Sequence, residues 1–351
     1  MIDTTEYRRP CSPLVSPGGI ERFEQDMTVT VSADVSLREL QQNLSGIGQW
    51  LPIDGNPDSS MGELVEGNST GPLRLGYGAW RDLLLGCQFT NGRGELITAG
   101  GRAFKNVAGY DLTKLMVGQQ GALGKMVTIT TRTYKRPSRA MIVRFTPDRD
   151  VVNRLLPSVC RPQWMILNAE GLYAGYLGEE RMIDFIDGAM AGYSPIERER
   201  MEPGAEMEKR TALWEMFVCE GGGRGVLPVR MTSEEHGRDA HATLDAHATF
   251  QEHGRDAHAT LDDHATGFIL FRASVPPARV VEFVAKAKLT KWVADAAFGI
   301  VRGGCRDEEW GLVCESAIAV GGRAWETPGS NDLTSHPVLR RLIDSFAHRI
   351  D

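Results

Sequence analysis

The sequence predicts an α+β protein with two domains. Its 351 residues correspond to about two domains of ordinary size. Short strand and helix patterns alternate with glycine-rich turns as far as Pro137. From Ser138 the expected order is strand, helix, strand, strand, helix and then strand, helix, strand, strand, which is typical of an antiparallel sheet with helices on one side. We therefore expect domains at 1–137 and 138–330 and a final helical segment at 331–351.

The first domain begins with a strand and a well-marked helix. Residues 27–31 alternate between apolar and polar side chains, as a half-buried strand does. Ser36 and Glu39 have the spacing of a capping box, in which each side chain accepts an orphan backbone N–H at a helix start. The apolar residues that follow at 37, 40 and 44 give the helix one buried face.

Three further elements complete the first domain. Residues 83–90 and 95–99 flank the turn 91–94 and predict a β-hairpin. Asp111 is expected to cap a short helix that ends at Met116. Residues 126–134 are rich in Thr, Val and Ile and predict a strand.

The glycine-rich stretches of this domain are its most informative feature. Glycine lets backbone N–H groups approach a ligand and adopt positive φ, so such loops can cradle anionic oxygens. A single stretch would indicate only a turn, but four of them interleaved with strands favour a cradle for a phosphate or a dinucleotide. Neither the Rossmann glycine motif nor the P-loop motif is present. The stretches are 55–71, 76–78, 100–101 and 118–124.

The second domain contains the remaining elements and one repeated segment. Strands are expected at 140–145, 164–167, 172–177, 267–275, 292–301 and 311–320. Helices are expected at 148–159, 179–190, 277–287 and 335–350. Residues 236–245 recur at 253–262, and six of the eight histidines lie within 236–264. Their five- and six-residue spacings do not share one helix face, so we favour a surface insertion at 232–266 over a metal site.

The composition excludes several classes of function. The chain has 39 Lys and Arg against 46 Asp and Glu, a net charge of −7, and no long basic run, so nucleic acid and anionic membranes are poor candidates as partners. No stretch of about 18 apolar residues could span a bilayer. Residues 1–13 lack the apolar core of a secretory signal, so we expect a cytoplasmic protein.

The cysteines give no sign of a metal centre. They are too scattered for an iron–sulfur cluster or a zinc site, so we expect buried free thiols and no metal. The six are Cys11, Cys87, Cys160, Cys219, Cys305 and Cys314.

Four motifs together resemble a known flavoprotein family. They are QWLPID at 49–54, NSTGP at 68–72, LGYGAWRDL at 75–83, and KNVAGYDL at 105–112 followed by GALG at 121–124. This combination resembles the FAD-binding subunit of glycolate oxidase, also called glycolate dehydrogenase, which is a flavoprotein of the vanillyl-alcohol-oxidase type. The strong part of the resemblance covers residues 26–137.

The resemblance implies a fold, a cofactor and a function. The fold would be a PCMH-type FAD-binding domain followed by an antiparallel-sheet cap domain. The chain would assist the oxidation of glycolate to glyoxylate and pass electrons to a larger FAD-linked subunit and an iron–sulfur subunit, with membrane association only through that complex. Two alternatives stay open. One is a structural subunit without FAD, and the other is a stand-alone FAD-dependent dehydrogenase for another 2-hydroxy acid.

The family also implies which residues would contact FAD, which we expect to bind non-covalently. The flavin and pyrophosphate would be lined by Pro52, Asp54, Ser59, Ser60, Gly62, Asn68, Ser69, Thr70 and Gly71. The supporting wall would be formed by Tyr77, Gly78, Arg81 and Asp82. The adenosine side and the flavin edge would be held by Gly109, Tyr110, Asp111, Gly121, Leu123, Gly124 and Lys125. No convincing set of His and Arg residues appears outside the repeat, so the catalytic residues stay unassigned.

Two features depart from the family pattern. The family has an earlier glycine-rich phosphate loop, whereas this chain begins just after its position. We expect either a truncated start, or a protein that binds FAD weakly or not at all. Lys125 stands where the family has an apolar β-branched residue, and we expect this lysine to be exposed because long charged side chains extend to solvent.

Overall fold

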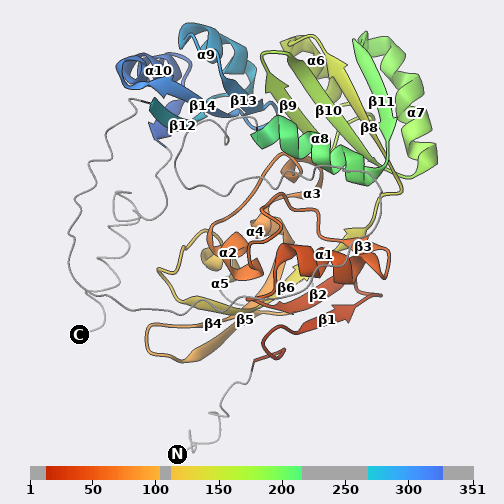
Figure 1. Ribbon diagram of the computed structural model, residues 1–351, viewed down its shortest axis with the longest axis vertical. Helices are drawn as coiled ribbons and strands as arrows, with labels where there is room; N and C mark the ends of the chain where they lie inside the picture. Colours follow the sequence, from red (N-terminus) through yellow and green to blue (C-terminus); the bar gives the residue numbers. More distant parts are fainter. Residues whose placement is uncertain (1–12, 103–111, 216–267, 327–351) are drawn as a thin grey trace, which may run out of the picture.

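The computed structural model describes residues 13–102, 112–215 and 268–326, which form two large sheets and a small two-stranded one with their helices (Figure 1). We call residues 13–137 the N-terminal region and residues 138–326 the C-terminal region. In Figure 1 the N-terminal region, coloured red to yellow, lies below the C-terminal region, coloured green to blue. The predicted insertion at 232–266, the predicted helix at 335–350 and the expected cap Asp111 lie outside the described residues.

The N-terminal region is built on a five-stranded antiparallel sheet with the order β1-β2-β6-β4-β5. The strand expected at 27–31 and the hairpin around 91–94 are confirmed as β2, β4 and β5. The strand expected at 126–134 ends earlier, because a separate two-stranded sheet pairs Trp50 with Tyr134. The strands are β1 (Ile20–Phe23), β2 (Thr28–Ser32), β3 (Gln49–Trp50), β4 (Leu84–Thr90), β5 (Leu96–Gly100), β6 (Lys125–Arg132) and β7 (Tyr134–Lys135).

Two capping boxes start the main helices of this region. Ser36 and Glu39 cap α1 as predicted, and Leu37, Leu40 and Leu44 are buried. The same device starts α2 at Ser60, a helix that the sequence pattern did not reveal. The helices are α1 (Leu37–Ser45), α2 (Met61–Glu66), α3 (Arg74–Tyr77), α4 (Trp80–Leu83) and α5 (Leu112–Met116).

The C-terminal region is one eight-stranded antiparallel sheet with the order β11-β8-β10-β9-β13-β14-β12-β15. Its strands are β8 (Arg139–Phe145), β9 (Trp164–Asn168), β10 (Gly171–Gly178), β11 (Glu197–Met201), β12 (Phe268–Ser274), β13 (Trp292–Asp295), β14 (Ile300–Arg306) and β15 (Arg323–Glu326). Its helices are α6 (Arg149–Leu155), α7 (Glu180–Met190), α8 (Pro203–Glu215), α9 (Val280–Lys286) and α10 (Asp307–Ala319), with short 3₁₀ turns η2 (Ala191–Tyr193) and η3 (Pro277–Arg279).

The helices cover both faces of this sheet rather than the single face that was expected. Along β8, Met141 and Val143 point into a core with α6, α7, α9 and α10, whereas Ala140 and Ile142 point into a second core. That second core also contains side chains of α8 and of the N-terminal region. Figure 1 accordingly shows α8 on the side of the sheet that is turned toward the N-terminal region. Helix α8 therefore lies where the two regions meet.

Two expectations for the C-terminal region are wrong. Residues 311–320 were expected to be a strand but belong to α10, because Val313 and Ala317 have helical spacing and are buried together. The single strand expected at 292–301 is two strands, β13 and β14. The chain reverses between them, since the carboxylate of Asp295 accepts the N–H groups of Ala297 and Phe298 and Gly299 has a φ of 67°.

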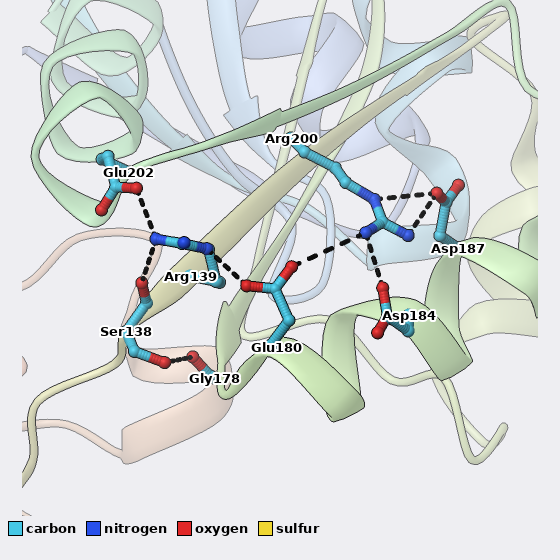
Figure 2. A network of polar contacts seen from close by, with 8 residues as sticks. All are labelled: Ser138, Arg139, Gly178, Glu180, Asp184, Asp187, Arg200 and Glu202. Atoms are coloured by element: carbon cyan, nitrogen blue, oxygen red, sulfur yellow. Dashed lines mark hydrogen bonds and ion pairs between the residues drawn. The ribbon is translucent and has the colours of Figure 1, made fainter.

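The outer strand β11 is tied to α7 by exposed ion pairs (Figure 2). Arg200 on β11 contacts Asp184 at 2.6 Å and Asp187 at 2.7 Å, both on α7. Arg139 on β8 contacts Glu180 at 2.6 Å. Charges on an edge strand hinder pairing with another chain. Each such exposed pair contributes little to stability. Substitution of Arg200 can therefore serve as a control for substitution of buried arginines.

The described cysteines and helices agree with the expectations from composition. Cys87, Cys160 and Cys305 are buried, and Cys314 is half-buried. Among the described helices, none has the length and apolarity needed to cross a membrane.

Candidate functional site

The candidate site lies between a loop of the N-terminal region and the facing side of the C-terminal sheet. The loop runs from Ser69 through Thr70 and Gly71 to Arg74 at the start of α3, and Asp54, which precedes α2, lies against it. It faces strands β12, β13 and β14 and the end of α8 near Trp214. Residues that are far apart in the chain therefore meet at one place.

Asp54 holds this loop closed. Its Oδ2 accepts the backbone N–H of Leu73 at 2.7 Å, and its backbone carbonyl accepts the hydroxyl of Ser69 at 3.4 Å. Gly71 lies directly against it: a Cβ atom on Gly71 would come within 2.5 Å of the Asp54 Cβ. The turn therefore requires glycine at 71, because the Asp54 side chain fills the space.

We expect Gly71→Ala to cost about 1–3 kcal/mol of unfolding free energy, because the added methyl group displaces Asp54. Urea denaturation measures this cost. Gly188→Ala is the control, since Gly188 lies in α7 with nothing within 4 Å of an added Cβ. This control should gain up to about 1 kcal/mol from helix propensity. Equal losses in both variants would contradict the close approach at 71.

A buried polar chain continues from Asp54 into α8. Arg210 donates from Nη1 to Asp54 Oδ1 and from Nε to Glu206 Oε1, the latter at 2.8 Å. Trp164 on β9 donates its indole N–H to the same Glu206 oxygen at 2.6 Å. Burial raises the pKa of Glu206 to about 8 and lowers that of Arg210 to about 9. This polar chain thus links both regions through side chains that are largely shielded from water.

Three arginines and one aspartate line a small cavity next to this chain. Arg272 and Arg302 are directly opposite each other on β12 and β14, and Arg74 enters from the N-terminal region. Like charges in this arrangement repel each other. Asp295 is the aspartate that lines the cavity, and its Oδ2 accepts a hydrogen bond from Arg74 Nε at 3.2 Å. The cavity measures about 10 Å³, which is room for about one water.

The charges in this cavity perturb one another. Burial raises the pKa of Asp295 to about 6, against the opposing effect of Arg74. Burial also lowers the pKa of Arg272, and the nearby positive charge of Arg74 adds to this effect. The Nε of Arg272 is buried and has no hydrogen-bond partner within the described part of the chain. Such a group is suited to an anionic ligand.

A second hollow, larger and more open, lies at the far end of the N-terminal sheet. Its volume is about 490 Å³, which falls in the range of ligand sites. The side chain of Gln119 shapes its rim, because it accepts the N–H of Leu123 and donates to the carbonyl of Gly124, both at 2.8 Å. Gly121 is exposed with a φ of 83°, and nothing lies within 4 Å of where its Cβ would be. The hollow is lined by Glu66, Thr90, Asn91, Gly92 and residues 121–125.

The structure divides the residues expected from the family between these two places. Thr70 and Gly71 line the small cavity beside Asp54, whereas Gly121, Leu123, Gly124 and Lys125 line the larger hollow. Lys125 is exposed, as predicted. Gly109, Tyr110 and Asp111 lie outside the described residues. Contact of any of these residues with a cofactor stays a prediction.

The other expected residues build the loops themselves. The Ser60 hydroxyl caps α2, and a Cβ on Gly62 would approach the carbonyl oxygen of Ala33 within 3.1 Å. Tyr77 packs edge-on between Trp50 and Tyr134, at 5.4 and 5.1 Å between ring centroids. The rest are as follows: Pro52 is buried, Ser59 accepts the N–H of Leu37, Asn68 ends α2 at a φ of 49°, Gly78 has a φ of 88°, Arg81 is exposed, and Asp82 accepts the N–H of Ala79.

Sequence reasoning missed the charged residues that distinguish the site. Arg272 and Arg302 each interrupt a strand of apolar and small residues, which is the signal that could have revealed them. Glu206 and Arg210 are four residues apart on α8 and look like an ordinary surface pair. Their burial depends on the docking of α8 between the two regions, which no local pattern shows.

Part of this chain is similar to known proteins. Residues 17–100 match the model of an FAD binding domain. A mitochondrial D-lactate dehydrogenase (cytochrome) of Arabidopsis thaliana is 33% identical over 118 residues, which cover 34% of this chain and 21% of that protein. The glycolate oxidase subunit GlcE of Escherichia coli (strain K12) is 33% identical over 130 residues, 36% of this chain and 37% of that protein. The chain thus spans well under half the length of the curated relatives it matches.

A solved structure shares the fold over almost the whole chain. An alkyldihydroxyacetonephosphate synthase superposes with a TM-score of 0.59 at 13% identity, covering 96% of this chain and 65% of that one. At this identity the likeness concerns the fold alone. Because it covers 96% of this chain, the likeness extends well beyond residues 17–100, which match the family model.

Proposed function

We propose, from the premise that residues 17–100 form an FAD binding domain of the PCMH type, that this chain is the FAD-binding subunit of an oxidoreductase acting on small 2-hydroxy acids such as glycolate. The observation that carries the proposal is the meeting of the Thr70–Gly71 turn with Arg74, Arg272 and Arg302. A loop of the cofactor domain and a cluster of carboxylate-binding groups thereby share one cavity.

The residues present fit a dinucleotide. The larger hollow offers an open glycine turn and the ammonium group of Lys125, which suit phosphate oxygens or the adenosine end. The loop that carries Thr70 and Gly71 is preformed by Asp54 and suits the flavin end. FAD, when bound, supplies the acceptor for the hydride of the α-carbon. We propose that FAD is held non-covalently, since the described cysteine of this region, Cys87, is buried in β4.

The chain's own residues would orient the substrate and take up its proton. The small cavity is lined by the ion pair of Arg74 and Asp295. The substrate carboxylate would replace Asp295 as the partner of Arg74, with Arg272 as its second contact. Asp295 Oδ2 would then be free to accept the hydroxyl proton. Loss of the Arg74 partner raises the pKa of Asp295 further, because Arg74 lowers it in the closed pair.

We further propose that the chain works in a complex with a larger FAD-linked subunit and an iron–sulfur subunit. The name of the relative GlcE, a subunit of glycolate oxidase, supports this arrangement. Co-expression with candidate partner subunits followed by size-exclusion chromatography tests it, and a chain that always elutes alone speaks against it.

The function is tested by adding FAD and then a hydroxy acid to the purified full-length chain without oxygen. Binding of FAD should quench its fluorescence, and glycolate should bleach the visible absorbance of the flavin, alone or with partner subunits. Arg272→Met should raise the glycolate concentration for half-maximal bleaching by about tenfold or more, and Asp295→Asn should slow bleaching by about 10²–10⁴-fold.

Arg323→Met is the matched control for these variants, because Arg323 is exposed on β15. It should leave both quantities unchanged. A chain that binds no FAD would refute the proposed function. Binding of FAD with equal bleaching in the parent, Arg272→Met and Asp295→Asn would refute the assigned roles.

A further inference from the structure

A series of hydrogen-bonded polar side chains around Arg210 joins the two regions away from both cavities. Arg210 and Glu206 belong to α8, Trp164 belongs to β9, and Asp54 belongs to the N-terminal region. The side chains of Arg210 and Glu206 are 4% and 1% exposed. None of these four residues lines either of the two hollows described above. Their role is therefore not to touch a small molecule in those hollows.

The series of hydrogen-bonded side chains ends on the backbone of the loop at residues 70–74. Both carboxylate oxygens of Asp54 accept a hydrogen bond. Oδ2 accepts the backbone N–H of Leu73, and Oδ1 accepts from the guanidinium of Arg210. The orientation of the Asp54 carboxylate is therefore fixed from the side of α8. Gly71 packs against the same carboxylate with no space for a side chain. A movement of Arg210 is thus transmitted to residues 70–74.

The surroundings make this connection strong. Trp164 is fully buried, and Leu73 lies in the apolar cluster that both regions form. Charged hydrogen bonds are stronger in such a medium than in water, and an unpaired partner is costly there. A second donor, the Trp164 indole, fixes Glu206, so that Arg210 has little freedom to turn away.

We propose that Arg210, held by Glu206, is a positioning residue that couples the docking of α8 to the geometry of the FAD loop through Asp54. The loop at 70–74 keeps its binding conformation only while α8 lies against it. Release of α8 would loosen the loop and weaken the binding of FAD, although Arg210 itself does not touch the cofactor. The part concerning FAD rests on the proposed function, whereas the coupling between α8 and the loop does not.

The test combines FAD affinity with amide hydrogen exchange in the full-length chain. Arg210→Lys keeps the charge but loses the planar fork that reaches Asp54 and Glu206 together. We expect this variant to raise the dissociation constant of FAD by about tenfold. In the FAD-free chain, hydrogen exchange at the Leu73 amide should be faster by about tenfold. Exchange on β8, for example at Val143, should stay unchanged, which shows that the chain is folded. Arg200→Lys on the exposed network of Figure 2 is the control and should change neither quantity.

A double-mutant cycle separates positioning from general destabilisation. Asp54→Asn and Arg210→Lys should be strongly non-additive in Leu73 exchange, because either change breaks the same connection. Additive effects, or an unchanged Leu73 amide in Arg210→Lys, would overturn the proposal. If the parent chain binds no FAD, the proposed function fails, yet the exchange measurements still decide the coupling.

Discussion

Arg210→Met lowers the free energy of unfolding by about 3–5 kcal/mol, as expected when one partner of a buried ion pair is removed. Methionine fills a similar volume but leaves Asp54 without its cation, and Asp54 is only 14% exposed. Glu206 loses its Nε donor in the same step. Urea denaturation followed by tryptophan fluorescence measures the loss as a lower midpoint with an unchanged slope.

Two further variants make this result specific. Arg200→Met removes an arginine with two aspartate partners, but on the surface, and should cost at most about 1 kcal/mol. Adding Asp54→Asn to Arg210→Met leaves no buried charge unpaired at this end of the chain, so the double variant should be more stable than Arg210→Met alone. A double variant that is less stable than the single one would show that the cost comes from lost packing instead.

The stability of the folded chain should fall as the pH rises from about 5 to 8. Burial raises the pKa of Glu206 from 4.5 to about 8, so the folded state keeps a proton that the unfolded state has released. The stabilisation is complete below pH 4.5 and is lost as the pH passes the folded value. Asp295 acts in the same direction, with its pKa raised by burial from 3.8 to about 6. One such group gives a slope of up to about 1.4 kcal/mol per pH unit.

The groups around Glu206 identify which variant tests this slope. Arg210 of α8 and Trp164 of β9 donate to its carboxylate, and Asp54 lies beyond Arg210. Tyr77 of α3 also lies near, since its pKa is raised first by burial and then by the charge of Glu206. Glu206→Gln keeps an acceptor for both donors but cannot titrate. We expect the slope between pH 6 and 8 to disappear in this variant, while the part below pH 6 that belongs to Asp295 stays.

Glu202→Gln is the control, because Glu202 is exposed just before α8 and pairs with Arg139. It should keep the slope of the parent chain. Unfolding curves at pH 5, 6, 7 and 8 give the comparison. A slope that survives between pH 6 and 8 in Glu206→Gln would show that another group carries it.

Elements whose conformation is fixed by near neighbours were predicted well. The capping box at Ser36, the hairpin around 91–94 and the hairpin of β9 and β10 all depend on residues within a few positions of one another. Helix α10 shows the limit of this reasoning. Its β-branched residues Val313 and Ile318 favour a strand locally, but the burial of Val313 and Ala317 against the sheet selects the helix.

The candidate site divides in the same way. The turn at 121–124 and the close approach at Gly71 were indicated by glycine, since positive φ and missing side chains are local needs. The meeting of Arg74 with Asp295 joins residues 221 positions apart, and that of Asp54 with Arg210 joins residues 156 apart. Such pairs depend on strand register and on the docking of α8.

The sequence by itself determined the α+β class, the loops that resemble an FAD site, and the capped helix α1, because these follow from backbone preferences and short-range hydrogen bonds. Only the tertiary structure decided which charges are buried and paired, because burial is a property of the assembled regions. The arginine cavity and the Asp54–Arg210–Glu206 chain therefore exist only once α8 and the eight-stranded sheet have packed against the N-terminal region.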